Sequence, residues 1–398
     1  MKNPSVRGTK FPASPIRKLK SYADRAVERG IKILRMNIGQ PDIETPLNMR
    51  KALKNFDKTV IGYGPSQGLD EYQRGLVGYY ERHGINLDCE DIIVTTGGSE
   101  AIIMGFSVCC DPGDEVLIPE PFYTNYNGFA VAAGLKVKPV TTRIEDNWQL
   151  PEIEEIEALL TPKTKAFMLC NPNNPTGKVY PEDEVKKLAY LAKKHDLFLF
   201  GDEVYREFIF SGETHTSILD MPEIEENAVL FDSISKRFSA CGARIGAFVT
   251  RNREISQAAL KFGQARLCPP TVDQILAIPS LSLGKEYFDN IREEYKKRRD
   301  TVLNALSEIE DVEFRVPEGA FYITVKLPVQ NAEHFVIWLL SEYEINGETL
   351  MLAPAEGFYA TPGLGRNEVR IAFVLDNEKT MRAMNILKKG LAEYVSAH

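Results

Sequence analysis

A lysine at the end of an apolar run is the residue of this chain best suited to covalent chemistry. Lys236 follows the hydroxyls of Ser233 and Ser235, and Arg244 stands eight residues after it. A lysine amine can form an imine with a carbonyl cofactor, while hydroxyls and a guanidinium can hold a phosphate on the same cofactor. The stretch therefore predicts a site for pyridoxal phosphate, with Lys236 as the point of attachment.

Polar clusters follow three further apolar runs. In open α/β sheets, ligands bind beyond the carboxyl ends of the strands, so clusters in this position are expected to meet. A turn, a helix cap or a solvated surface would explain any one of them alone. All four together at one sheet edge predict a shared site. They span residues 97–100, 171–177, 202–205 and 233–236.

The chemistry of pyridoxal phosphate gives several of these residues a job. Asp202, a short acid in an apolar neighbourhood, would pair with the protonated ring nitrogen and keep the ring an electron sink. Asn174 and Tyr205 could hydrogen-bond the ring oxygen, and Tyr123 could stack on the ring face. Once substrate displaces it, the free amine of Lys236 could move a proton.

A phosphate cup is expected at the start of the helix that follows the first polar cluster. Glycines there allow close backbone approach, and the amides at a helix N-terminus face an anion. Hydroxyls and a guanidinium from the last cluster would complete the cup with charge-assisted hydrogen bonds. The predicted ligands are Gly98, Ser99, Glu100, Ser233, Ser235 and Arg244.

Short apolar runs that alternate with helical patterns predict the α/β fold class. The runs are nearly continuous, which is typical of a mainly parallel sheet buried between helices on both faces. One helix is expected over 182–195, after Pro181. The strands are expected at 92–95, 116–119, 166–170, 197–201, 229–232 and 245–250.

A second, smaller α+β domain is expected after a long charged helix over 285–308. Its strands would be 321–325 and 369–374, and its last helix would run over 376–395 with Asp376 as the N-cap. An amphipathic pattern over 16–30 predicts a helix that joins it. The predicted division is an irregular N-terminal arm at 1–15, a large cofactor-binding domain at 47–283, and a small domain made of 16–46 with 284–398.

Composition narrows the possible classes of function. The chain has 398 residues, 43% of them hydrophobic, and a net charge of −8, which argues against nucleic-acid binding. No apolar stretch is long enough to span a bilayer. Six cysteines and five histidines lack the spacing of a metal site, so no metal is expected, and a reducing cytoplasm is the expected location.

The chain resembles the class I/II aminotransferases, which are fold-type I pyridoxal-phosphate enzymes of the aspartate aminotransferase superfamily. The Asn-Pro-x-Asn-Pro-Thr-Gly and Ser-x-Ser-Lys elements are specific together. The resemblance covers nearly the whole chain. It rests on segments 37–42, 63–68, 171–177, 233–236, 319–322 and 369–371.

The resemblance implies a ping-pong transfer of an amino group between an L-amino acid and a 2-oxo acid, with Lys236 as the Schiff-base lysine. It implies that Arg370 binds the substrate α-carboxylate, and that Gly39 and Asn174 line the same carboxylate. Tyr63 resembles the tyrosine that reaches the phosphate of a neighbouring subunit, which implies a homodimer with shared active sites.

Some alternatives stay open at this point. Many aspartate-using relatives carry a basic residue in place of Ser99, and the candidates for a side-chain carboxylate clamp are Arg266 and Arg17. Within the fold, a C–S β-lyase could use the same lysine. A ligand-sensing regulator would be expected to carry a DNA-binding domain before residue 16. A nicotinamide dehydrogenase would need a Gly-x-Gly-x-x-Gly turn after an early strand, which this sequence lacks.

Overall fold

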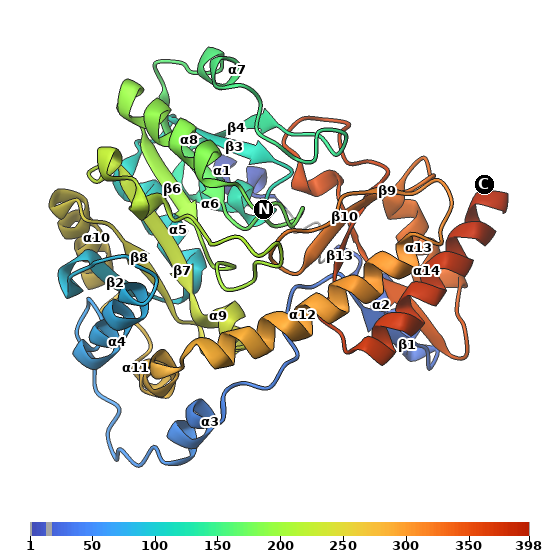
Figure 1. The fold of residues 1–398 in the computed structure, drawn as a ribbon, viewed down its shortest axis with the longest axis horizontal. Coiled ribbons are helices and arrows are strands. Elements are labelled where there is room, and N and C mark those ends of the chain that lie inside the picture. Colours follow the sequence, from blue (N-terminus) through green and yellow to red (C-terminus); the bar gives the residue numbers. More distant parts are fainter. Residues whose placement is uncertain (1, 13–17, 398) are drawn as a thin grey trace.

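The computed structural model describes residues 2–12 and 18–397. Within these residues the largest element is a seven-stranded sheet (Figure 1). In spatial order its strands are β2 (Ile92–Thr95), β8 (Gly246–Val249), β7 (Ala228–Ser233), β6 (Phe198–Asp202), β5 (Thr164–Cys170), β3 (Glu115–Glu120) and β4 (Lys136–Thr141). Only β8 runs antiparallel to its neighbours, so β2 and β7 point the same way and their carboxyl ends share one edge.

All six strands predicted for this sheet are confirmed, and β4 is an additional one. Strand residues divide between two buried clusters, because Val116 and Ile118 face one cluster while Leu117 faces the other. The apolar runs are continuous since both faces of the sheet are covered. By contrast, β4 lies at the edge of the sheet and is mostly half-exposed, so its sequence lacks that signal.

Helices cover both faces of the large sheet (Figure 1). The predicted helix over 182–195 is confirmed as α8, which follows Pro181 and has acidic residues in its first turn and basic ones in its last. The other helices around this sheet are α3 (Leu47–Lys54), α4 (Asp70–Glu81), α5 (Gly97–Cys109), α6 (Asn125–Ala133), α7 (Ile153–Ala158), α9 (Ile234–Arg237), α10 (Arg253–Ala265) and α11 (Thr271–Ala277).

The long helix α12 (Lys285–Leu306) runs diagonally from the large sheet to a smaller α+β part (Figure 1). A four-stranded antiparallel sheet there has the order β12 (Ala353–Pro354), β13 (Glu368–Ala372), β10 (Tyr322–Lys326) and β9 (Glu313–Phe314). A parallel pair joins β1 (Lys32–Arg35) to β11 (Glu348–Met351). The helices of this part are α2 (Lys20–Glu28), α13 (Ala332–Glu342) and α14 (Asn377–Ala397).

The ends of the chain differ slightly from the prediction. The N-terminal arm is not wholly irregular, because α1 (Val6–Lys10) forms a short helix whose Gly8 amide donates to the Ser5 hydroxyl at 3.0 Å. The predicted helix over 16–30 appears as α2, while Ile16 lies outside the described residues. Asp376 caps α14 as predicted, accepting from the Lys379 amide at 2.8 Å. Within the described chain, every helix is too short or too polar to cross a bilayer.

Candidate active site

A cavity of about 410 Å³ lies where the carboxyl ends of β5, β6 and β7 face the smaller sheet. Of the site residues predicted from the sequence, all but Glu100 and Tyr63 line it. The remaining lining residues were not predicted. They are Ile38, Ile102, Asn125, Cys170, Val204, Cys241 and Tyr322.

Lys236 lies on α9, a helix of four residues directly after β7. Its Nζ donates to the Gly39 carbonyl at 2.9 Å, a contact between residues 197 positions apart. Asp232 holds both ends of this helix, because its Oδ1 accepts from the Ser233 amide at 2.7 Å and from Arg237 Nη1 at 2.8 Å. So short a helix has little stability of its own, and this carboxylate helps to hold the backbone that carries Lys236.

The Asp232–Arg237 ion pair is buried, and neither residue lines the cavity. Burial alone would raise the pKa of Asp232, but Arg237, Arg206 and the hydrogen bonds to Arg237 and Tyr80 hold that pKa below its ordinary value. The Tyr80 hydroxyl donates to Asp232 Oδ2 at 2.8 Å. The carboxylate is therefore ionised, and its contacts with Ser233 and Arg237 support α9.

Asp202 ends β6 and is buried in the floor of the cavity. Burial raises the pKa of this carboxyl to about 6, against the lowering effect of a hydrogen bond from Tyr126. The Tyr126 hydroxyl donates to Asp202 Oδ2 at 2.6 Å. Sequence reasoning missed Tyr126, because nothing in the sequence distinguishes it from the other apolar residues of α6.

Arg370 lies on β13 and is almost fully buried. Its partners are uncharged: Nη1 donates to Asn174 Oδ1 at 2.9 Å and Nη2 to the Asn37 carbonyl at 2.6 Å. Burial lowers the pKa of this guanidinium. Its Nε has no hydrogen-bond partner among the described residues. A buried guanidinium with neutral partners is suited to bind a carboxylate from a ligand.

Hydroxyls, glycines and an arginine gather where the start of α5 lies beside the start of α9. The hydroxyls of Ser233 and Ser235 lie 2.8 Å apart. Gly97 has a positive φ of 73°, a backbone conformation that favours glycine, and a Cβ on it would fall 2.4 Å from Arg244 Nη2. The Arg244 guanidinium is exposed, and its Nη1 donates to the Cys241 carbonyl at 2.9 Å.

Glu100 and Tyr63 line a neighbouring hollow together with Arg266. The Glu100 carboxylate accepts from the Thr96 amide at 2.6 Å and pairs with Arg266 Nε at 3.0 Å. Any part of Glu100 in a phosphate cup would therefore come from its backbone amide. Arg266 is absent from the lining of the main cavity, and Arg17, the other candidate clamp, lies outside the described residues.

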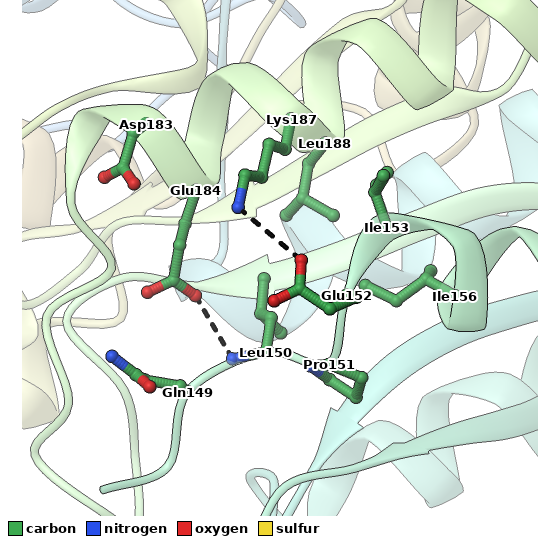
Figure 2. Close-up of a pocket in the computed structure, with 10 residues that line it drawn as sticks. All are labelled: Gln149, Leu150, Pro151, Glu152, Ile153, Ile156, Asp183, Glu184, Lys187 and Leu188. Atoms are coloured by element: carbon green, nitrogen blue, oxygen red, sulfur yellow. Dashed lines mark hydrogen bonds and ion pairs between the residues drawn. The ribbon is translucent and has the colours of Figure 1, made fainter. Parts of the chain in front are cut away.

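A smaller cavity of about 160 Å³ between α7 and α8 contains none of the predicted site residues (Figure 2). Its polar groups bind their own surroundings, since Glu184 accepts from the Leu150 amide at 3.2 Å and Lys187 lies 4.0 Å from Glu152 (Figure 2). These contacts tie the loop before α7 to the first turns of α8. They explain local structure and suggest no chemistry.

The main cavity fits pyridoxal phosphate on its own geometry. Asp202 is a buried carboxyl whose side-chain partner is a tyrosine hydroxyl, and a protonated ring nitrogen would supply the missing positive charge. The two serine hydroxyls and Arg244 match a phosphate, and the Lys236 amine faces the same space. The residues present therefore fit the cofactor.

Comparison with known proteins agrees with this fit. The model of the family "Aminotransferase class I and II" matches residues 31–387. An aspartate aminotransferase of Thermotoga maritima is 30% identical over 383 residues, which cover 96% of this chain and 97% of the relative. The aromatic-amino-acid aminotransferase 2 of Thermococcus litoralis is 31% identical over 389 residues, covering 96% of each chain.

Solved structures give the same result. A crystal structure of aspartate aminotransferase from Thermotoga maritima matches with a TM-score of 0.89 at 29% identity, covering 98% of this chain and 100% of that one. An alanine aminotransferase from Pyrococcus furiosus matches with a TM-score of 0.88, also at 29% identity and with coverage of 98% and 100%. These relatives and structures are all named as aminotransferases, so the C–S lyase alternative is not favoured. The chain belongs to the class I and II aminotransferase family, and it is a pyridoxal-phosphate-dependent enzyme of fold type I.

Proposed function

We propose that Lys236, Asp202 and Arg370 are the central residues of this aminotransferase, which moves an amino group between an L-amino acid and a 2-oxo acid in two half-reactions. One observation carries the proposal: an amine, a buried carboxyl and a buried guanidinium line a single cavity. When bound, pyridoxal phosphate supplies an electron-poor ring that stabilises the charge left when the Cα–H bond breaks.

Arg370 orients the substrate. Its planar guanidinium matches a carboxylate in two parallel hydrogen bonds, and its buried setting strengthens them. Asn174 holds Nη1 in place at 2.9 Å. With the α-carboxylate fixed here, the Cα–H bond is presented to the side of the cavity that holds Lys236.

Lys236 moves the proton. In its free form, Nζ accepts the proton from the substrate Cα and later gives it up again as general acid. The Gly39 carbonyl, 2.9 Å from Nζ, holds the amine within the cavity. With the cofactor bound, Asp202 would supply a negative charge to the ring nitrogen, and Tyr205 and Asn174 would donate hydrogen bonds to the ring oxygen.

Replacing the lysine tests this assignment. Lys236→Ala should lower the rate of amino-group transfer by roughly 1,000-fold, since both the attachment point and the general base are lost. Lys187→Ala is the matched control, because that lysine lies in α8 beside the smaller cavity. Equal rates for Lys236→Ala and the wild type would reject the proposed mechanism.

Half-reactions with single amino acids would identify the donor. The similar proteins include aminotransferases named for aspartate, aromatic amino acids and alanine. Charged side chains that line the cavity among the described residues are Asp202, Lys236, Arg244 and Arg370. If only aspartate and glutamate react, a cation other than these lining residues must bind the side-chain carboxylate. Reaction with alanine or phenylalanine would assign a neutral side-chain site.

The enzyme is proposed to be a homodimer with shared active sites, in which Tyr63 reaches the cofactor phosphate of the partner subunit. Exposure supports this proposal, because the Tyr63 side chain is 83% exposed in the single chain and lines a hollow beside the cavity.

We also propose that the chain has two domains, a large one at 47–283 and a small one made of 16–46 with 284–398. A cytoplasmic location is proposed too, because the six cysteines are free thiols.

A further inference from the structure

Tyr322, the first residue of β10 in the smaller sheet, contacts Tyr205, a predicted ring-oxygen ligand that follows β6 of the larger sheet. Its hydroxyl lies 2.8 Å from the Tyr205 hydroxyl, and the two rings meet edge to face at 5.6 Å and 83°. Both side chains are buried. Tyr322 belongs to segment 319–322, which resembles the family, but the sequence alone predicted no role for it.

The same phenol also touches the substrate side of the cavity. A Cβ on Gly39 would fall 1.7 Å from the Tyr322 hydroxyl oxygen, so the hydroxyl sits directly over this glycine. The Arg370 guanidinium carbon lies 4.5 Å from the centre of the Tyr322 ring. Tyr322 therefore contacts the proposed ring-oxygen ligand, the backbone that holds Lys236 and the proposed carboxylate ligand.

We propose that Tyr322 is a positioning residue that donates its hydroxyl proton to Tyr205 and thereby directs the Tyr205 proton to the cofactor's ring oxygen. This inference rests on the proposed role of Tyr205. A phenol has one proton to donate, and if Tyr205 gives that proton to the ring oxygen, it can only accept from Tyr322. The two hydroxyls then form a chain with a fixed direction.

A chain of this kind changes the electronic state of the bound cofactor. A donor that itself accepts a hydrogen bond is polarised and donates more strongly. The Tyr205 hydroxyl would therefore withdraw more negative charge from the ring oxygen when Tyr322 is present. Without Tyr322, the ring oxygen keeps more negative charge. The proton on the nitrogen that links the cofactor to Lys236 would then be held more tightly. The protonated form of the cofactor would then persist to higher pH.

The pH titration of the visible band of the cofactor-loaded enzyme measures this effect without turnover. Tyr322→Phe removes the hydroxyl and keeps the ring, and the titration midpoint should rise by roughly half a unit to one unit, the scale of one neutral hydrogen bond. Tyr205→Phe should raise it further. Adding Tyr322→Phe to Tyr205→Phe should produce no additional rise, because the first residue acts through the second.

Tyr295→Phe is the matched control. Its ring stacks on Phe321 in the same aromatic cluster, and its buried hydroxyl has no hydrogen-bond partner among the described residues. Its midpoint should equal that of the wild type. An unshifted midpoint in Tyr322→Phe would overturn the inference, and so would an equal rise in the Tyr205→Phe background. A wild-type protein that forms no visible band with pyridoxal phosphate would instead overturn the proposed function.

Discussion

Two ionisable side chains in the cavity are buried in settings that leave their charges uncompensated. Asp202 is paired with a tyrosine hydroxyl, and Arg370 is paired with an amide and a carbonyl. Burying a charge without an opposite charge costs free energy, so each residue lowers the stability of the empty protein. A ligand with a cationic ring nitrogen, and another with a carboxylate, would relieve that cost at each site.

The cofactor-free protein should show the cost at Asp202 as a pH effect on stability. The carboxyl has an ordinary pKa of 3.8 when unfolded and a pKa of about 6 when folded. The protonated carboxyl contributes to the free energy of unfolding, and this contribution is fully present below pH 4. It is lost as the pH rises through 6, which lowers the free energy of unfolding by up to about 3 kcal/mol. Urea unfolding of wild type and Asp202→Asn between pH 4 and 7 should show their difference changing by this amount. A pH-independent difference would contradict the assignment.

Arg370→Lys should reduce kcat/KM by about 100-fold, because an ammonium cannot reproduce the bidentate contact to a carboxylate. The loss should appear with every amino acid donor, since each carries the same α-carboxylate. Steady-state kinetics with two donors provides the measurement. Arg299→Lys is a suitable control, because Arg299 pairs with Asp300 away from the cavity. A loss confined to one donor would instead indicate a side-chain contact.

At the scale of elements, α9 depends on one buried carboxylate that binds at both its ends. Asp232→Asn should lower the free energy of unfolding by about 3–5 kcal/mol, because Arg237 would stay buried without its counter-charge. It should also weaken cofactor binding, since Lys236, Ser233 and Ser235 move with this helix. Denaturant unfolding and cofactor titration measure the two effects.

An exposed ion pair gives the control for that substitution. Glu182 pairs with Lys186 on the surface of α8, so Glu182→Gln should cost less than about 1 kcal/mol. Equal costs at the two sites would show that Asp232 has no special part in holding α9.

Predictability also varied from element to element. Continuous apolar runs predicted the strands that are buried on both faces. The helical pattern after Pro181 predicted α8. The edge strand β4 lacked a continuous apolar run. Most of the site was predictable because Lys236, Asp202 and Asn174 each lie at the end of a buried strand or just after one. Tyr126 and Tyr322 were not, since their roles depend on contacts with Asp202 and Tyr205 that no local pattern encodes.

At the scale of the molecule, the cavity needs both sheets. Lys236 follows the large sheet and Arg370 lies on the small one, while Gly39 comes from the segment after β1. No sequence spacing predicts that these three residues meet. The chain brings them together through α12 and the pairing of β1 with β11.

The proposed dimer is testable at this scale. The segment before Tyr63 exposes Val60 by 76% and Ile61 by 62% in the single chain, which is costly for apolar side chains unless a partner covers them. Sedimentation should give twice the mass of one chain, and Ile61→Asp should shift the protein towards the monomer. Val395→Asp, at a side chain 46% exposed on α14, should leave the mass unchanged. A wild-type monomer at micromolar concentration would contradict the proposal.

Borohydride reduction of the cofactor-loaded enzyme, followed by proteolysis and mass spectrometry, tests the central claim most directly. Reduction makes the link between amine and cofactor permanent, so the modified peptide identifies the lysine. We expect one pyridoxyl group per chain, attached to Lys236 in the peptide that also contains Ser233 and Ser235. A pyridoxyl group on a different lysine, or none on a fully loaded sample, would contradict the account.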